Sequence, residues 1–183
     1  PASVIAAVPP DTDRSVRDEL PGTTEVAPVV AAAIETLMPA ATARGIKVQT
    51  VLDPSAGLVS GDTDRLRQVV WNLISNAIKF TPTDGRVTAR VERVDPNVVI
   101  TVEDSGVGIS AEILPHVFER FRQGDSSNTR NHGGLGLGLA VVRHLVELHG
   151  GQVTASSAGE GRGATFTVTI PLLEPGGAGR ERG

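Results

Sequence analysis

Residues 65–82 read RLRQVVWNLISNAIKFTP, and this stretch decides the fold. Three polar residues in it, Asn72, Asn76 and Lys79, follow one another at spacings of four and three, so they line up on one helix face. Amides and an ammonium group in one row suit a ligand rich in oxygen, such as a hard cation with phosphates, although a solvated flank has the same pattern. Aliphatic residues on the neighbouring face have the spacing of a core helix: Leu66, Val69, Val70, Leu73, Ile74 and Ala77.

Two glycine-rich segments follow this helix. Asp104 ends a strand predicted over 98–103, and Gly106 and Gly108 after it allow close backbone approach. A carboxylate fixed there can accept a hydrogen bond from an exocyclic amine such as that of adenine, although an ordinary Asp-Gly turn has the same sequence. The second segment, GGLGLGL at 133–139, precedes a predicted helix, whose N-terminal N–H groups favour phosphate. Its spacing matches neither a Walker loop nor a dinucleotide fingerprint.

Taken together, these segments resemble the ATP-binding catalytic domain of histidine protein kinases, which belongs to the Bergerat-type ATPase superfamily. The resemblance covers about residue 24 to about residue 172. The ATP-binding catalytic domain is expected at 23–173. Composition without periodicity predicts a linker or disordered arm at 1–22 and a disordered tail at 174–183. The matching boxes are NLISNAIKF (72–80), DSGVGI (104–109), FERF (118–121), GGLGLGL (133–139) and GEGRGATF (159–166).

The resemblance also implies a role for each box. Asn76 is expected to coordinate Mg²⁺, Asn72 and Lys79 to lie near the ATP phosphates, and Asp104 to bind the adenine amine. Further nucleotide-side positions are implied at the glycine boxes, the F box and the final glycine segment: Gly106, Gly108, Phe118, Phe121, Gly134, Leu135, Gly136, Leu137, Gly138 and Thr165.

A lid is expected over about 121–135, anchored by the two Phe of the F box. Residues 122–134 contain no aliphatic side chain, so the lid is expected to be mobile until phosphates draw it inward. Many relatives carry a lid Arg at the position of Gln123, and Arg122 or Arg130 is the alternative source of that charge.

Two features favour phosphate transfer to a protein His over hydrolysis. Superfamily members that hydrolyse ATP carry a Glu four residues before the metal-binding Asn. Here that position is Asn72, whose amide cannot take a proton from water. All four His follow the N box and none precedes an acidic residue, so the phosphoacceptor is expected on a separate domain: His116, His132, His144 and His149. The chain, which starts at Pro, is therefore expected to be a kinase fragment.

The function implied is that of a two-component sensor kinase's catalytic domain, which donates the ATP γ-phosphate to the dimerisation and phosphoacceptor domain. A response regulator receiver domain is the expected downstream partner. One alternative is a nucleotide-binding regulatory module of the same fold that transfers nothing. A less favoured alternative is a relative that phosphorylates Ser on an anti-sigma antagonist.

Composition limits the remaining function classes. The net charge of −4 argues against a nucleic-acid surface, and the absence of Cys excludes disulfides and thiol chemistry. No apolar run approaches the roughly 20 residues of a membrane span, so no direct membrane contact is expected. We expect a cytoplasmic domain, whether or not its parent protein is membrane-anchored.

Periodicity predicts the other elements of a two-layer α/β sandwich, with a mixed sheet and helices. Helices are predicted at about 27–43, 111–115 and 135–149. Strands are predicted at about 46–52, 58–59, 86–94, 98–103, 152–157 and 163–171.

Overall fold

The computed structural model describes residues 22–119 and 135–173. Its main sheet has five strands in the order β2-β4-β5-β7-β6, in which β2 is parallel to β4 and the other neighbours are antiparallel. The strands are β2 (Lys47–Leu52), β4 (Arg86–Val94), β5 (Asn97–Asp104), β6 (Gln152–Ser156) and β7 (Ala164–Pro171).

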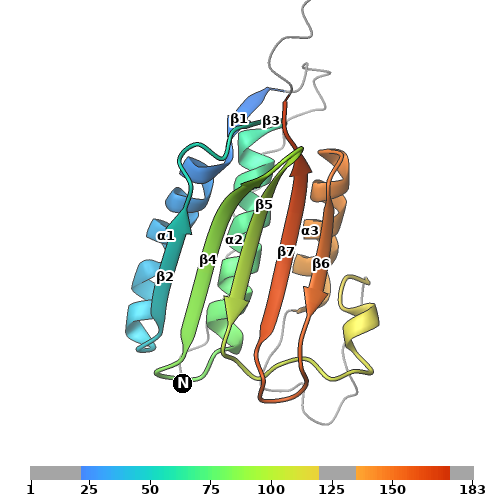
Figure 1. Cartoon of the computed structure of the whole chain (residues 1–183). Helices are drawn as coiled ribbons and strands as arrows, with labels where there is room; N and C mark the ends of the chain where they lie inside the picture. The colour runs from blue at the N-terminus through green and yellow to red at the C-terminus, as the bar shows by residue number, and fades with distance from the viewer. Residues whose placement is uncertain (1–21, 120–134, 174–183) are drawn as a thin grey trace, which may run out of the picture.

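Three helices cover one face of this sheet, and no described element covers the other face (Figure 1). They are α1 (Val26–Ala43), α2 (Thr63–Phe80) and α3 (Leu135–Leu148). A short second sheet pairs β1 (Thr23–Glu25) with β3 (Leu58–Ser60), and a 3-10 turn, η1, spans Leu114–His116. The two-layer α/β sandwich with a mixed sheet is therefore confirmed.

The two faces of the sheet follow from the alternation of residues along each strand. Side chains of a strand point to opposite faces in turn. In β4, Val87, Ala89 and Val91 are fully buried beneath the helices, whereas Thr88 and Arg90 lie on the open face. β5 and β7 alternate in the same way, and their buried residues complete the core: Val98, Ile100, Val102, Phe166, Val168 and Ile170.

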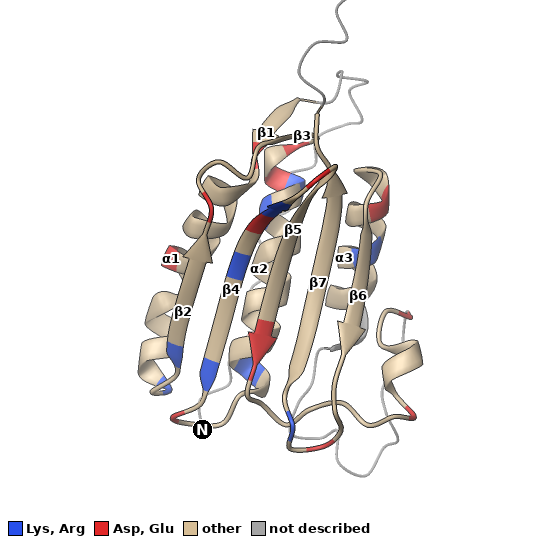
Figure 2. Ribbon diagram, in the orientation of Figure 1, with Lys and Arg blue, Asp and Glu red and all other residues tan. Residues whose placement is uncertain are grey.

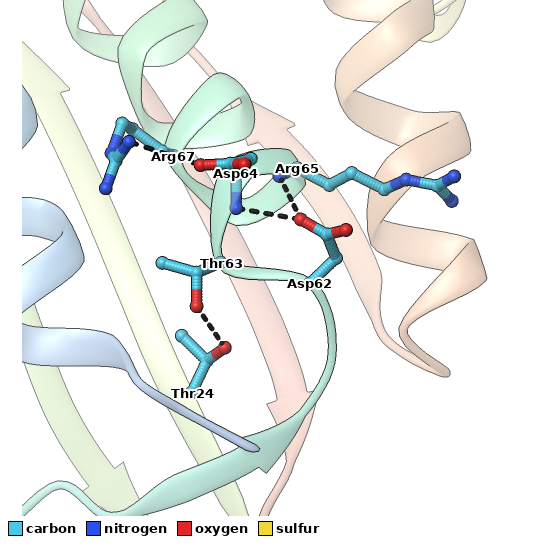
Figure 3. A network of polar contacts seen from close by, with 6 residues as sticks. All are labelled: Thr24, Asp62, Thr63, Asp64, Arg65 and Arg67. Atoms are coloured by element: carbon cyan, nitrogen blue, oxygen red, sulfur yellow. Dashed lines mark hydrogen bonds and ion pairs between the residues drawn. The ribbon is translucent and has the colours of Figure 1, made fainter. Parts of the chain in front are cut away.

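The N-box helix α2 begins at a well-defined cap. The carboxylate of Asp62 accepts hydrogen bonds from the backbone N–H groups of Asp64 (2.8 Å) and Arg65 (3.1 Å), which satisfies two of the donors left open at a helix start (Figure 3). Thr24 of β1 joins this end through the Thr63 hydroxyl, 2.8 Å away. The helix ends at Phe80, because Pro82 shortly after it cannot continue a helix.

Helix α1 differs from one expectation. By length and composition it is long and apolar enough to cross a membrane, whereas no such segment was expected from the sequence. In the fold its apolar stripe is instead used in packing, because Val30 and Ala33 are almost fully buried and the helix contacts α2 and β2. The same apolar stripe serves a core helix, so composition alone does not separate the two cases.

Two short elements also differ from the sequence-based predictions. The helix expected at 111–115 is the 3-10 turn at Leu114–His116. Strand β1 was not predicted, because three residues are too few to show a period. The linker and tail, and the lid with Phe121, Arg122, Arg130, His132 and Gly134, lie outside the described residues.

Candidate functional site

The polar stripe of α2 faces the start of α3. The side-chain nitrogen Nδ2 of Asn76 is buried and has no hydrogen-bond partner among the described residues. A Cβ atom on Gly138 would lie 3.9 Å from this nitrogen, in ordinary van der Waals contact, so the second glycine box lies directly beside the amide. Buried amide groups normally find a partner, and one without a partner indicates a position that a ligand completes. The structure thus brings the N box and the second glycine box together.

Lys79 lies near the C-terminal end of the same stripe. Partial burial lowers the pKa of its ammonium group, and its Nζ atom lies 5.5 Å from the centroid of the Phe80 ring. Asn72, one turn before Asn76, is half-buried. The three residues therefore share one helix face, as the spacing predicts, with the lysine at the end nearest the first glycine loop.

Asp104 closes β5 with a carboxylate that is only 9% exposed. Its Oδ1 accepts a hydrogen bond from the backbone N–H of Gly106 at 2.8 Å. Burial raises the pKa of Asp104, whereas hydrogen bonds from the backbone of Gly106 and Ala164 act in the opposite direction. A buried carboxylate held in this way is a rigid acceptor for an amine donor.

The first glycine loop, residues 105–109, is held between α2 and the loop before β7. The Val107 N–H donates to the Phe80 carbonyl at 3.0 Å, and the Gly163 N–H donates to the Gly106 carbonyl at 3.1 Å. A Cβ atom on Gly106 would collide with the Phe80 carbonyl, and one on Gly108 with the Gly159 carbonyl. Both glycines are thus required by close contacts between backbone segments, as the sequence predicts.

Ser157 is a site residue that sequence reasoning missed. Its hydroxyl oxygen accepts a hydrogen bond from the Ile109 N–H (3.0 Å), and the hydroxyl donates to the Gly163 carbonyl (2.6 Å). One side chain therefore ties the first glycine loop to the final glycine segment. A single Ser before a glycine-rich turn gives no signal of this role, because its partner is 48 residues away.

Arg44 is a second residue that the sequence did not reveal. Its guanidinium group donates to three backbone carbonyls at the end of α2, those of Ile78 (2.6 Å), Lys79 (3.0 Å) and Thr81 (2.9 Å). The last carbonyls of a helix have no partner within the helix, so this contact fixes the end of α2 beside the first glycine loop.

Comparison with known proteins agrees with this geometry. The sequence model of the histidine kinase-, DNA gyrase B- and HSP90-like ATPases matches residues 61–174, well over half of the chain. The chain belongs to this ATPase family. It is 47% identical over 117 residues to the circadian input-output histidine kinase CikA of Synechococcus elongatus, an alignment that covers 62% of this chain and 15% of that kinase.

Solved structures place the domain within this family. The mycobacterial sensor histidine kinase MprB is 28% identical, with a TM-score of 0.71 over 83% of this chain and 97% of that one. Full-length ShkA, solved in complex with AMPPNP, is 29% identical, with a TM-score of 0.71 over 88% of this chain and 33% of that one. The chain is thus an ATP-binding catalytic domain of the histidine kinase type.

The first Phe of the F box, Phe118, contacts the sheet. The ring of Phe118 packs edge-to-face against Phe166 of β7, with centroids 6.1 Å apart, so the first Phe of the F box is anchored in the core.

The prediction that Thr165 lies on the adenine side is not supported by the strand register. Thr165 pairs with Glu103 on the open face, whereas Ala164 is opposite Asp104 on the helix side. Because side chains alternate between faces, Thr165 points away from the Asp104 side.

Two of the described histidines, His116 and His149, have structural contacts. Nδ1 of His149 lies 2.6 Å from the Leu145 carbonyl, and its Nε2 accepts from the Asp62 N–H at 3.1 Å. His116 lies 2.7 Å from a carboxylate oxygen of Glu119. His149 therefore joins the end of α3 to the cap of α2.

The donor set on α2 fits a magnesium ion that arrives with a nucleotide. Mg²⁺ in nucleotide sites takes one or two protein oxygens, and the phosphates and waters supply the rest. Asn76 offers such an amide, and turning it about its terminal torsion exchanges nitrogen and oxygen. Within the described ranges no cluster of three or more His, Cys, Asp or Glu could hold a metal by itself.

Proposed function

We propose that this domain binds Mg-ATP and donates the γ-phosphate to a His on the separate dimerisation and phosphoacceptor domain of its kinase. This proposal rests on the Asn76 amide, whose buried Nδ2 atom has no hydrogen-bond partner among the described residues and lies beside Gly138 of the second glycine box. Asn76 would hold Mg²⁺, and Asn72 and Lys79 would lie along the phosphates. The ion, when bound, would neutralise phosphate charge.

Asp104 supports the adenine part of the proposal. Its carboxylate is rigid and buried, and it can accept a hydrogen bond from the exocyclic amine of adenine. Guanine carries a carbonyl in that position, which would face the carboxylate as a second acceptor. The site should therefore prefer ATP to GTP, because an acceptor facing an acceptor leaves both groups unpaired.

Transfer to a His is favoured over hydrolysis by the residue at position 72. Asn72 has no basic group that could activate water, whereas a neutral imidazole is nucleophilic without a general base. The domain's part would be to position the phosphate and offset its charge, with the lid cation from Arg122 or Arg130. Downstream, a response regulator receiver domain would take the phosphoryl group, and the domain would work in the cytoplasm without nucleic-acid or membrane contact.

Calorimetry with two matched variants tests the nucleotide site. We expect Mg-ATP to bind the wild-type domain more tightly than Mg-GTP does. Asn76→Ala should greatly weaken Mg-ATP binding, whereas Ser75→Ala, one position off the stripe, should leave it unchanged. Equal affinities for ATP and GTP would remove the adenine assignment, and an Asn76→Ala variant with wild-type affinity would make the stripe a solvated flank.

A further inference from the structure

The open face of the sheet carries a second polar site, away from the helices. A groove of about 280 Å³ crosses β2, β4 and β5 and reaches the loop between β6 and β7. Eight residues line it: Gln49, Arg86, Thr88, Arg90, Glu103, Asp104, Ser105 and Arg162. We call it the arginine groove. It runs along the face of the sheet that the helices leave uncovered, which is the face seen in Figure 2, and at Asp104 and Ser105 it borders the nucleotide site.

Charge in the arginine groove is not balanced locally. Three guanidinium groups line the groove with two carboxylates, of which Asp104 is buried and only Glu103 is on the open face, in a chain whose net charge is −4. Within residues 22–119 and 135–173, none of these three guanidinium groups has an ion pair or a hydrogen-bond partner. Elsewhere Arg side chains pair with nearby acids, as in the Arg67–Asp64 and Arg143–Glu147 pairs. Unpaired guanidinium groups gathered in one groove suit carboxylates or phosphates of a partner.

The spacing of the arginines favours an extended protein segment. Arg86 and Arg90 lie four residues apart on the same face of β4, which at the rise of a strand is about 13 Å. A single small anion is much shorter than this. An extended peptide has the same rise and also places alternate side chains on one side, so its carboxylates can match both arginines. Val51, which pairs with Arg90 across β2 and β4, is 54% exposed and offers apolar contact beside them.

Glu103 argues against a polyphosphate or nucleic-acid ligand. It pairs with Thr88, the residue midway between Arg86 and Arg90, so a negative charge interrupts the basic row. A ligand with a phosphate at every step would meet this carboxylate, whereas a peptide can place a neutral residue there. We propose that the arginine groove docks an acidic, extended segment of a protein partner through carboxylates that pair with Arg86, Arg90 and Arg162.

A labelled peptide tests the proposal without involving nucleotide. The probe is a fluorescein-labelled peptide that repeats Glu-Thr-Thr-Thr, so that its carboxylates have the four-residue spacing of Arg86 and Arg90 and a neutral Thr lies opposite Glu103. Its binding to the wild-type chain is measured by fluorescence anisotropy at low salt. The affinity should fall steeply between about 50 and 300 mM salt, because exposed charges are screened. The charge-reversal pair Arg86→Glu and Arg90→Glu should weaken binding about tenfold or more, since it replaces two attractions with repulsions.

Matched controls separate the groove from net charge. Arg65→Glu with Arg67→Glu changes the net charge equally on α2 and should leave peptide binding near the wild-type value. Circular dichroism must show native folding of both variants, and Arg162→Gln, in an exposed loop, provides a milder test that should weaken binding severalfold. Any of three results would overturn the proposal. The two double variants could lose affinity equally, a peptide with Gln in place of Glu could bind as tightly as the probe, or inorganic phosphate could compete with an affinity equal to that of the peptide.

Discussion

The guanidinium group of Arg44 lies 2.6 Å from the carbonyl oxygen of Ile78, and this contact attaches the turn after α1 to the last turn of α2. The same group also donates to the carbonyls of Lys79 and Thr81. The carbonyl of Phe80, between these two, accepts from Val107 of the first glycine loop. A cation at a helix C-terminus is favourable, and here it holds the segment to which the adenine-side loop is attached.

Arg44→Ala should therefore destabilise the domain. The substitution removes charge-assisted hydrogen bonds to three carbonyls at the end of α2, and we expect the free energy of unfolding to fall by about 1.5–3 kcal/mol. Urea unfolding measures this loss. Hydrogen exchange at residues 105–109 should also become faster, since the helix end no longer fixes this loop.

Arg143→Ala serves as the control. Arg143 pairs with Glu147 on the exposed side of α3, where an ion pair contributes about 0.5 kcal/mol or less. If Arg44→Ala cost no more than Arg143→Ala, Arg44 would not hold the end of α2.

Asp104→Asn should separate stability from nucleotide binding. Burial raises the pKa of Asp104, so the folded protein binds more protons than the unfolded chain between the ordinary pKa of 3.8 and the raised one. The stability associated with this group is thus present below 3.8 and is lost as the pH rises through the folded pKa. At neutral pH the buried, ionised carboxylate lowers the free energy of unfolding, and the neutral Asn side chain removes this effect.

Thermal unfolding at pH 7 should therefore give Asp104→Asn a Tm equal to or above that of the wild type. The difference should shrink as the pH falls towards 3.8. Mg-ATP affinity should fall by more than about 1.5 kcal/mol, because a charged acceptor is lost. A variant that unfolds more easily at pH 7 yet binds ATP normally would contradict both the burial argument and the adenine assignment.

Long periodic elements were predictable from the sequence. The bounds of α2, its Asp62 cap and its termination before Thr81 follow from local patterns, namely a helical stripe, a capping residue and a Pro at position 82. Asp104 and the two glycines after it were predictable because a strand end and a turn also have local signals. That Asn76 lies close to Gly138 could be predicted only from the resemblance to histidine kinases, because 62 residues separate the two positions in the chain.

Contacts between distant residues had no local signal. Arg44 and Ser157 are ordinary exposed residue types in sequence, and their roles depend on carbonyls that tertiary packing brings within reach. Thr165 was predicted on the nucleotide side, whereas it lies on the open face of the sheet, for a related reason. Alternation along β7 shows that Ala164 and Thr165 face opposite sides, but only pairing with β5 shows which of them lies opposite Asp104.

Ser157→Ala should weaken nucleotide binding without unfolding the domain. It removes the hydrogen bond to Ile109 of the first glycine loop and those to Gly159 and Gly163 of the final glycine segment, and a typical hydrogen bond contributes about 1 kcal/mol. We expect Mg-ATP affinity to fall severalfold in calorimetry, with a small loss of thermal stability. Ser156→Ala, at the exposed neighbouring position, is the matched control and should behave like the wild type. Equal affinity of the two variants would show that the loop does not need the Ser157 bridge.

Isolated from an acceptor domain, the chain should not phosphorylate itself on His. His116 and His149 are engaged in structural contacts, and none of the four His is followed directly by Glu or Asp. Incubation with γ-labelled ATP, followed by analysis for acid-labile phosphate, should show no stable phosphohistidine. Adding the dimerisation and phosphoacceptor domain of the same kinase should label that domain's His, and Asn76→Ala should abolish the labelling while Ser75→Ala preserves it. Robust labelling of the chain alone would mean that it carries its own acceptor, whereas tight Mg-ATP binding with no labelling of the added domain would favour the regulatory module that binds without transfer.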